Sequence, residues 1–466
     1  MDRKISTAAI AMVLWGVGGA FADRYATPPG AYQTGTAYLE NAEYDKAVEA
    51  LSEAIRQNPQ HTDATIHRAS AYLSKGWSNR AIADCNVALR LDPSNAKAVH
   101  VRGVAYGNFG DMDRALADQH EAIRLDPQLA PAYVHRGAVL WERGQRDQAA
   151  VDLDTAIRLT GEAIRRDPTG HRAYTQRAFA HLVRGDLDKA VADCSQAIRL
   201  NPRSVEAYCK RGFARRKQGD VNGAIADFTA ATQLHPKSIP AHYRRAIACC
   251  QRGDAQIELS RYAELFRQDP KQVDRFHGRD LPYAQKSDLQ KTVTDLTIAI
   301  RLADESIRLN ADGPEAYRDR AVSYLALGEF DRAMTDLAAA IRINPRDARS
   351  YGKRGFLRIK RNTAAKLPAE TDRAIADLTE AIRLAPGLAE AYCYRSIAQL
   401  VRGNMASGLA DCNEAIRLDT KLAQAYRLRS LIYNTMHQAP QAAADAARAD
   451  ELEARRPAVP RGPVRH

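Results

Sequence analysis

The hexapeptide Ala-Ile-Arg-Leu-Asp-Pro at residues 122–127 returns as Ala-Ile-Arg-Leu-Asn-Pro at residues 197–202 and as Ala-Ile-Arg-Ile-Asn-Pro at residues 340–345. Prolines that close such phrases recur every 34 residues, first at Pro59, Pro93 and Pro127, and then at Pro168, Pro202, Pro236 and Pro270. A fixed period of this length indicates a chain built from one repeated supersecondary unit. Most of the 466 residues are therefore expected to form one repetitive fold rather than several unrelated domains.

Each unit has the pattern of two packed helices. When the recurring proline is numbered slot 32, small residues recur at slots 8, 20 and 27, and Tyr recurs at slot 4. Slots 4, 8 and 11 share one helical face, as do slots 20, 24 and 27. Glycine at slot 15 suits the end of a first helix, and proline at slot 32 ends a second helix. Twelve units follow, which begin at Pro28, Thr62, Ala96, Ala130, His171, Val205, Ile239, Val273, Pro314, Ala348, Ala389 and Ala423.

This set of slots resembles the tetratricopeptide repeat, a helix–turn–helix unit of 34 residues. The resemblance extends from Pro28 to about Glu453 and is closest to bacterial, exported members of the family. It implies an all-α fold, a right-handed superhelical α-solenoid of about twelve units, because one unit cannot bury its apolar face alone. It also implies a scaffold for protein–protein interaction, with a protein or peptide partner held on the concave surface.

The first 22 residues have the pattern of a secretory signal peptide. Asp2-Arg3-Lys4 precede an uncharged apolar stretch that ends at Ala20-Phe21-Ala22, a site of the A-x-A type. We expect cleavage after Ala22 and a periplasmic or secreted protein; the alternative is that the same stretch anchors the chain in a membrane. The remaining organisation is expected to be a short leader at 23–27, an N-terminal block of seven units at 28–271, an irregular or extended unit at 272–313, a C-terminal block with a capping helix at 314–454, and a disordered basic, Pro-rich tail at 455–466.

Three units are seven residues longer than the period, which is close to two helical turns. In the units that begin at Ala130 and Val273, the extra residues are expected to lengthen the second helix. In the unit that begins at Ala348, residues 361–370 are expected to form a surface loop. Residues 254–290 match the pattern poorly, so they are expected either to form an irregular seam between two blocks or to continue the stack with a drifted sequence.

The chain carries a net charge of +12 and has a pI near 9.3, which can indicate an acidic partner. However, Arg recurs at slot 7 and Asp at slot 23, which predicts a ladder of ion pairs within the stack that fixes register. Another Arg recurs at slot 29, where it complements the dipole of the second helix. The positive charge thus has a structural explanation, and nucleic acid is not the expected partner. A binder of an anionic polymer or surface (cell-wall glycan, lipid or nucleic acid) is kept as the alternative function. The expected ladder includes Arg68, Arg102, Arg136, Arg177 and Arg211 on one side and Asp84, Asp118, Asp193 and Asp227 on the other.

No motif of an enzyme or a metal site is present in the sequence. The P-loop, GxGxxG, GxSxG and HExxH patterns are absent, so no catalytic residue, cofactor or metal is expected. The cysteines at slot 24, Cys85, Cys194 and Cys412, are expected to be small core residues. A disulfide between Cys393 and Cys412 is not expected, because slot 5 is assigned to the groove and slot 24 to the core.

The resemblance also assigns a partner-binding groove. In the family, slots 2, 5, 9, 12 and 13 face the concave side, and slot 9 carries large apolar residues in this chain. Slot 12 belongs either to the same apolar strip or to the core. The lysine, asparagine and arginine set with which some family members grip a chain end is not assembled, so an apolar or amphipathic segment is the expected occupant. The expected groove residues are Val104, Phe179, Phe213, Ile247, Val322, Phe356 and Ile397.

Overall fold

A computed structural model describes residues 30–252, 283–365 and 368–454 of the chain. Within these ranges the chain forms 22 α-helices and no strand, joined by short turns. The helices are α3 (Ala31–Glu40), α4 (Tyr44–Gln57), α5 (Thr62–Ser74), α6 (Ser78–Leu91), α7 (Ala96–Phe109), α8 (Met112–Leu125), α9 (Ala130–Glu142), α10 (Arg146–Arg166), α11 (His171–Arg184), α12 (Leu187–Leu200), α13 (Val205–Gln218), α14 (Val221–Leu234), α15 (Ile239–Arg252), α17 (Tyr283–Leu309), α18 (Pro314–Ala326), α19 (Phe330–Ile343), α20 (Ala348–Ala365), α21 (Pro368–Leu384), α22 (Ala389–Val401), α23 (Met405–Leu418), α24 (Ala423–Thr435) and α25 (Ala439–Ala454).

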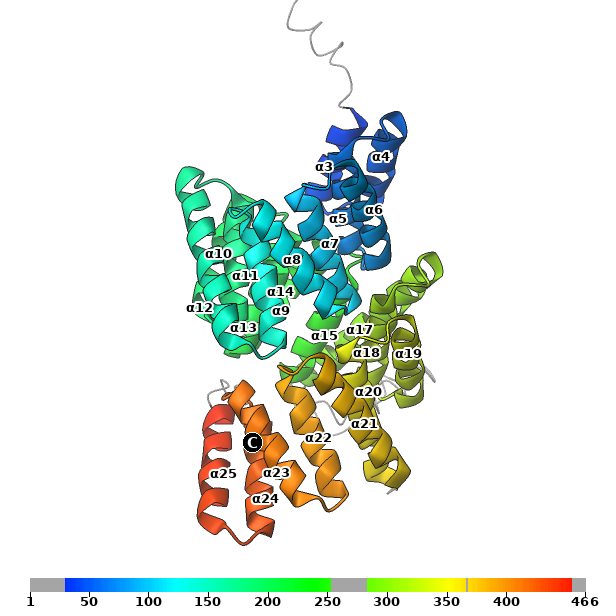
Figure 1. The fold of residues 1–466 in the computed structure, drawn as a ribbon. Coiled ribbons are helices and arrows are strands. Elements are labelled where there is room, and N and C mark those ends of the chain that lie inside the picture. The colour runs from blue at the N-terminus through cyan, green and yellow to red at the C-terminus, as the bar shows by residue number, and fades with distance from the viewer. Residues whose placement is uncertain (1–29, 253–282, 366–367, 455–466) are drawn as a thin grey trace, which may run out of the picture.

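Consecutive helices pair into antiparallel hairpins, and the hairpins stack into the superhelical solenoid that the sequence predicts (Figure 1). Slot-15 glycines join the two helices of a hairpin with positive φ, for example 100° at Gly110 and 91° at Gly185. The core between hairpins is lined by small slot-20 and slot-27 residues such as Ala81 and Ala88, both fully buried. The three slot-24 cysteines are buried and free, as expected.

The predicted ladder between slots 7 and 23 is present. Arg68 donates from Nε and Nη2 to the two carboxylate oxygens of Asp84, at 2.8 and 2.7 Å, so the pair is bidentate. Its Nη1 reaches back to the second helix of the preceding hairpin and donates to Ser52 Oγ at 3.1 Å. The same guanidinium therefore ties two hairpins together. The pairs are Arg68–Asp84, Arg102–Asp118, Arg136–Asp152, Arg177–Asp193, Arg211–Asp227, Arg245–Asp295, Arg320–Asp336, Arg354–Asp377, Arg395–Asp411 and Arg429–Asp445.

One of these pairs, Arg245–Asp295, shows that two of the units assigned from the sequence form a single hairpin. Arg245 of α15 binds Asp295 of α17, 50 residues later, whereas the pairs in units of ordinary length are 16 residues apart. The difference is 34 residues, one full period. Helix α15 therefore packs with α17 in a single hairpin, although the sequence assigned them to separate units that begin at Ile239 and Val273. The described ranges contain eleven hairpins. Most of the irregular seam expected at residues 254–290 lies outside the described residues, because residues 253–282 are not among them.

The long units have two different outcomes. Helix α10 has 21 residues and α17 has 27, against 14 in a typical second helix, so the expected helix extensions are confirmed. The loop expected at residues 361–370 is wrong. Helix α20 runs on to Ala365, and α21 begins at Pro368, so the extra residues lengthen both helices. Pro368 can begin α21 because the backbone N–H of the first residue of a helix has no partner within the helix, so its absence in proline costs no hydrogen bond.

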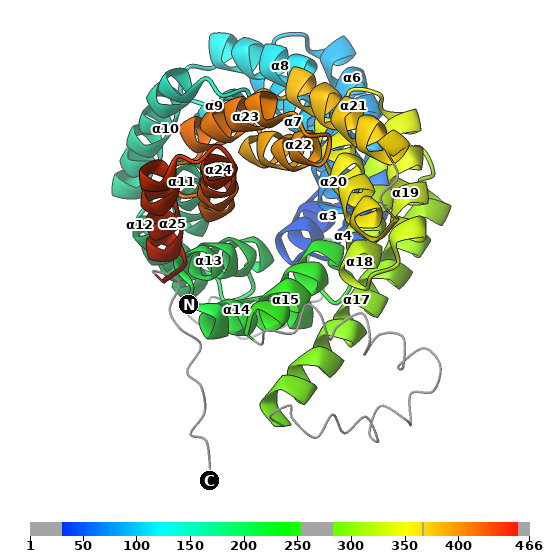
Figure 2. The ribbon, with the colours of Figure 1, turned by 90° about the horizontal axis from the view of Figure 1, so that it is seen from below.

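The solenoid returns on itself, and its second turn packs against its first. In Figure 2, α22 to α25 lie over the helices of the early hairpins, and the hairpins surround a central opening. The indole nitrogen of Trp77, in the turn between α5 and α6, donates to Ser306 Oγ of α17 at 3.0 Å. The amides of Asn79 and Asn310 exchange hydrogen bonds at 3.0 and 2.9 Å. These bonds join segments that are about one superhelical turn apart.

The same kind of contact is repeated in the next two hairpins. Asn344, which follows α19, donates to the backbone carbonyl of Phe109 at 2.6 Å. The backbone N–H of Gly387, which follows α21, donates to the carbonyl of Glu142 at 2.7 Å. A Cβ atom at Gly387 would lie 2.4 Å from that carbonyl oxygen, so only glycine allows this approach. The turns at the ends of α7 and α9 therefore dock on the ends of α19 and α21.

The assignment of slot 5 to the groove is wrong for several units. Val134, Thr175 and Cys393 occupy this slot and are 1%, 4% and 1% exposed. Cys393 packs against Ala415 and Ala425 of the neighbouring helices. The reason is that the first helix of the next hairpin covers this side of the preceding one.

Among the described helices, none is both long enough and apolar enough to cross a membrane.

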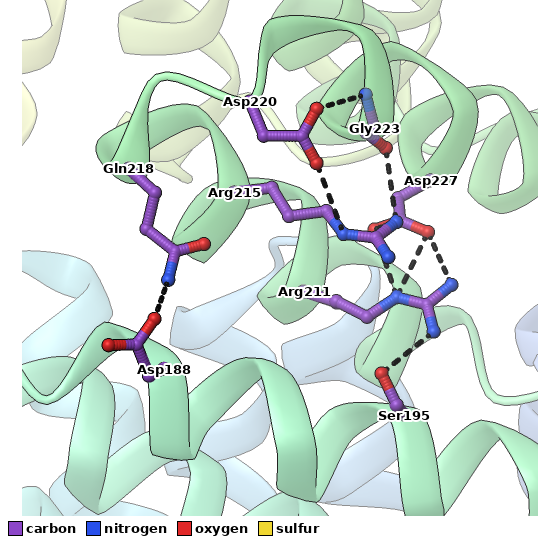
Figure 3. Close-up of polar contacts among 8 residues, drawn as sticks. All are labelled: Asp188, Ser195, Arg211, Arg215, Gln218, Asp220, Gly223 and Asp227. Carbon is purple, nitrogen blue, oxygen red and sulfur yellow. Dashed lines mark hydrogen bonds and ion pairs between the residues drawn. The ribbon is translucent and has the colours of Figure 1, made fainter. Parts of the chain in front are cut away.

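The ladder leads to a paired prediction about stability. Asp152 is 4% exposed, and its hydrogen bonds in the described structure come from Arg136 alone. Asp227 is 2% exposed but also accepts from Arg215 Nη1 at 2.9 Å (Figure 3). We expect Arg136→Ala to destabilise the fold by about 1–3 kcal/mol, because it leaves a buried carboxylate without a partner. Arg211→Ala should cost less, since Arg215 stays on Asp227.

Urea unfolding followed by circular dichroism measures both effects. Arg199→Ala is the control, because Arg199 is exposed in the last turn of α12. An Arg136→Ala curve that coincides with this control would show that the ladder does not stabilise the stack.

Candidate functional site

Four cavities of the described structure lie on the inner wall of the superhelix or between its two turns. One cavity, of about 560 Å³, is lined by the first helices of consecutive hairpins, α7, α9, α11 and α13. Its apolar floor is formed by slot 9, which the sequence assigned to the groove, and by slot 12, which it assigned either to the groove or to the core. The floor includes Val104, Trp141, Phe179, Leu182 and Phe213. We call this cavity of about 560 Å³ the central pocket.

The expected groove residues divide into two groups. Val104, Phe179 and Phe213 meet in the central pocket, and Phe356 lines a separate cavity of about 340 Å³ beside Tyr394, with ring centroids 4.5 Å apart. The other three are not part of these cavities. Val322 is 9% exposed, Ile397 packs on the core between α21 and α22, and Ile247 is half-buried. The apolar strip is thus interrupted rather than continuous.

Phe179 has a double role. It packs on a core cluster with Val134 and Leu153, and its ring also faces the pocket. The Nζ of Lys210 lies 4.5 Å from the centre of this ring, a cation–π distance. Phe213 is half-buried on α13 and belongs to none of the core clusters of the described residues. Phe213 is therefore the residue that best separates binding from folding.

One wall of the central pocket is cationic, which the sequence analysis missed. Lys210 and Lys217 of α13, Arg244 of α15 and Arg349 of α20 all line it. Lys210 and Arg244 occupy slot 6, which was not counted among the concave positions. A second signal was available, because Lys353 also occupies slot 6 and lines the neighbouring cavity. The sequence could have shown this wall if slot 6 had been read beside slot 5.

His135 lines the central pocket, and His100 beside it lines the adjoining cavity. The ring centroids of His100 and His135 are 5.3 Å apart, and His135 is 5.4 Å from Phe179. His100 Nδ1 lies 2.8 Å from Gln119 Oε1. Desolvation lowers the pKa of His135 well below its ordinary value, and the positive charges of His100 and Lys210 act in the same direction. His135 is thus held neutral at pH 7, and it adds a polar but uncharged surface.

The central pocket continues into a longer channel. A second cavity, of about 620 Å³, shares Val104, His135, Phe179 and Lys210 with it and extends toward α3 and α5. A third, of about 300 Å³, lies where Trp77 meets the second turn, and shares Asn108 and Arg349. Because neighbouring cavities share residues, the inner wall offers an elongated site rather than an isolated small-molecule pocket.

Comparison with known proteins agrees with this architecture. Family models described as "Tetratricopeptide repeat" match residues 32–96, 288–348 and 96–129, and one described as "TPR repeat" matches residues 180–219. The chain is a tetratricopeptide-repeat protein. Proteins of this fold generally act as non-catalytic scaffolds that bind other proteins. No curated protein matches the sequence.

Several solved structures have a similar fold at low identity. Yeast Tom70 is 16% identical, with 93% of this chain and 97% of that chain covered and a TM-score of 0.38. A tetratricopeptide repeat protein from Parabacteroides merdae is 15% identical, with 73% and 100% covered and a TM-score of 0.41. A monomeric mutant of IFIT1 with Gppp-AAAA is 15% identical, with 91% and 90% covered and a TM-score of 0.43. At such identities the likeness concerns the fold alone.

The third cavity generates a prediction about pH. Glu315 of α18 lines it, is 7% exposed, and neither of its carboxyl oxygens accepts a hydrogen bond from a described residue. Burial raises the pKa of Glu315 to about 7, and the charge of Arg318 opposes this rise. The carboxyl thus keeps its proton to a higher pH in the folded chain than in the unfolded chain, where its pKa is about 4.3. The protonated carboxyl of Glu315 therefore contributes fully to the free energy of unfolding below about pH 4.3, the pKa in the unfolded chain. This contribution is lost as the pH rises through about 7, the pKa in the folded chain.

Glu315→Gln keeps the neutral form at every pH. We expect its thermal midpoint to match that of the wild type at pH 4.5 and to exceed it increasingly up to pH 8. Asp331→Asn is the control, because the side chain of Asp331 is 90% exposed. A midpoint difference for Glu315→Gln that does not change between pH 4.5 and pH 8 would contradict a raised pKa at this buried position.

Proposed function

We propose that this protein is a non-catalytic scaffold that holds a segment of a partner protein in the superhelical channel. The observation that carries the proposal is the convergence of Val104, Phe179 and Phe213 in one cavity of about 560 Å³. Half-exposed apolar side chains on a concave surface suit an extended or helical segment of another chain. The sharing of residues between neighbouring cavities supports an occupant longer than a small molecule.

We also propose that the protein works in the cell envelope, after export and cleavage behind Ala22. The support is the charged start and the apolar stretch before Ala20-Phe21-Ala22. Sequencing of the mature N-terminus from the producing cell should find Asp23 first. A chain that retains Met1 would contradict export with cleavage and leave membrane anchoring as the alternative.

Site-directed photo-cross-linking in intact cells tests the location of the partner. A photoreactive amino acid in place of Val104 or Phe213 should attach the same protein, because both side chains line the central pocket. The matched control position is Val151, which is 65% exposed on α10 and lines none of the four cavities described. Attachment of that protein equally from position 151 would contradict binding in the channel.

A substitution tests the same proposal by loss of function. Phe213→Ser should abolish capture of the cross-linked partner and leave the thermal midpoint nearly unchanged, because Phe213 contributes to the pocket more than to the core. Phe179→Ser should lose capture and also lower the midpoint, since Phe179 packs on Val134 and Leu153. Val151→Ser should change neither. If Phe213→Ser unfolds the chain instead, the ring belongs to the core and the groove is misplaced.

The alternative function, a binder of anionic polymers, predicts a different salt response. Binding to a polyanion weakens steeply and log-linearly as salt increases, whereas binding through an apolar floor does not. The acidic side chains along the channel, such as Glu206 and Glu390, do not favour a uniform polyanion.

A further inference from the structure

The central pocket has an excess of positive charge that its own acidic residues do not neutralise. Its lining includes four cations, Lys210, Lys217, Arg244 and Arg349, and one carboxylate, Glu142. Glu142 already forms an ion pair with Arg349. Lys210 pairs with Glu206, which lies in the adjoining cavity. Lys217 and Arg244 form no ion pair with any residue in the described part of the chain, and the carboxyl of Asp319 acts on Arg244 only from a distance.

Residues of both turns of the superhelix contribute to this charged wall. Lys210, Lys217 and Arg244 belong to α13 and α15 of the first turn, and Arg349 belongs to α20 of the second. Arg349 lines the pocket beside Glu142, the last residue of α9, with which it forms an ion pair. Lys353, one helical turn further along α20, lines the next cavity. Desolvation lowers the pKa of its ammonium group, Glu390 and Asp319 oppose this shift, and Arg318 and Arg349 add repulsion. A cation in such surroundings gains from an incoming anion.

The cations lie directly beside the apolar floor. Lys210 Nζ is 4.5 Å from the centre of the Phe179 ring, and Lys217 Nζ is 5.8 Å from the centre of the Phe213 ring. A ligand that satisfies both must present carboxylates and apolar side chains within a few ångströms of each other. The rest of the floor is aliphatic or indole, formed by Val104, Leu182 and Trp141.

We propose that the occupant of the central pocket is a protein segment in which acidic residues alternate with apolar residues. This inference rests on the proposed function of the channel and specifies the chemistry of the partner. A nucleic acid or an anionic glycan fits less well, because Glu40 and Glu206, beside Arg172 and Lys210 in one adjoining cavity, and Glu390, beside Lys353 in another, interrupt the positive lining that an evenly charged chain would follow. A peptide can place its carboxylates at Lys217 and Arg244 and neutral residues elsewhere.

Fluorescence anisotropy with defined peptides tests the inference on the full chain. The probe is a fluorescein-labelled peptide of twelve residues, made of acidic–apolar pairs (Glu or Asp beside Leu or Phe) separated by serine. It is blocked at its C-terminus so that no terminal carboxylate is present. A second peptide has Gln and Asn in place of the acids, and a third has serine in place of Leu and Phe. An oligo-deoxythymidine of equal length represents a polyanion.

We expect the acidic–apolar peptide to bind most tightly. Loss of its carboxylates should weaken binding about tenfold, the effect of removing a charge-assisted contact. The variant Lys217→Gln/Arg244→Gln should bind the acidic–apolar peptide more weakly than the wild type by a similar factor. It should bind the Gln/Asn peptide with the same affinity as the wild type. The control Arg90→Gln/Arg342→Gln removes two exposed arginines in the last turns of α6 and α19, outside the four cavities, and should bind every probe like the wild type.

The outcomes separate this inference from the proposed function. Equal binding of the acidic and the Gln/Asn peptides, both abolished by Phe213→Ser, would overturn the charge preference and leave the scaffold intact. No binding of the acidic–apolar peptide would overturn the inference, while the photo-cross-linking experiment would still decide the scaffold function. Tighter binding of the oligonucleotide than of any peptide would overturn both in favour of a polyanion.

Discussion

The structure depends on one side-chain interaction, the three-way contact of the slot-7 arginine. Its planar guanidinium binds an aspartate of its own hairpin through two nitrogens, and in many hairpins the third nitrogen binds a polar residue of the preceding one. Arg102, with Asp118 and Asn86, is an example. Because the guanidinium is rigid and always charged, each contact restricts how one hairpin is rotated on the next. The burial of such pairs is expected to determine register more than to add stability.

The hairpins, each stacked on the one before, bring the solenoid back to its own first turn. The contacts at Trp77, Phe109 and Glu142 are then possible, and they create surfaces that no single hairpin has. The central pocket is one of these surfaces. Its apolar floor comes from neighbouring hairpins of the first turn, and its cationic wall includes Arg349 from the second. The partner specificity that we propose rests on Lys217 and Arg244 of the first turn, and Arg349 of the second turn completes the wall beside them.

Most of the local structure could be predicted from the sequence, because each slot has a local physical role. The slot-15 glycines, the buried slot-24 cysteines and the ladder of arginine and aspartate are where the period places them. The pairing of α15 with α17 could not be predicted in this way, since the intervening sequence has the length of one repeat and preserves the period. The docking of one turn on another depends on small rotations summed over many hairpins, which no local pattern contains. The slot-9 residues Val104, Phe179 and Phe213 line one cavity, and their role in binding a partner stays a prediction, whereas the charges at slot 6 were overlooked.

The central claim is that the two turns of the superhelix are in contact in solution, and cross-linking across the contact tests it most directly. Asn79 and Asn310 hydrogen-bond to each other although they are 231 residues apart. In the double variant Asn79→Cys/Asn310→Cys, mild oxidation should form an intramolecular disulfide that changes the mobility of the unreduced chain on a denaturing gel. Each single variant controls for the native cysteines. Rapid cross-linking in the double variant alone is the result we predict; cross-linking no faster than in the single variants would show that the turns stand apart and that the central pocket lacks its second wall.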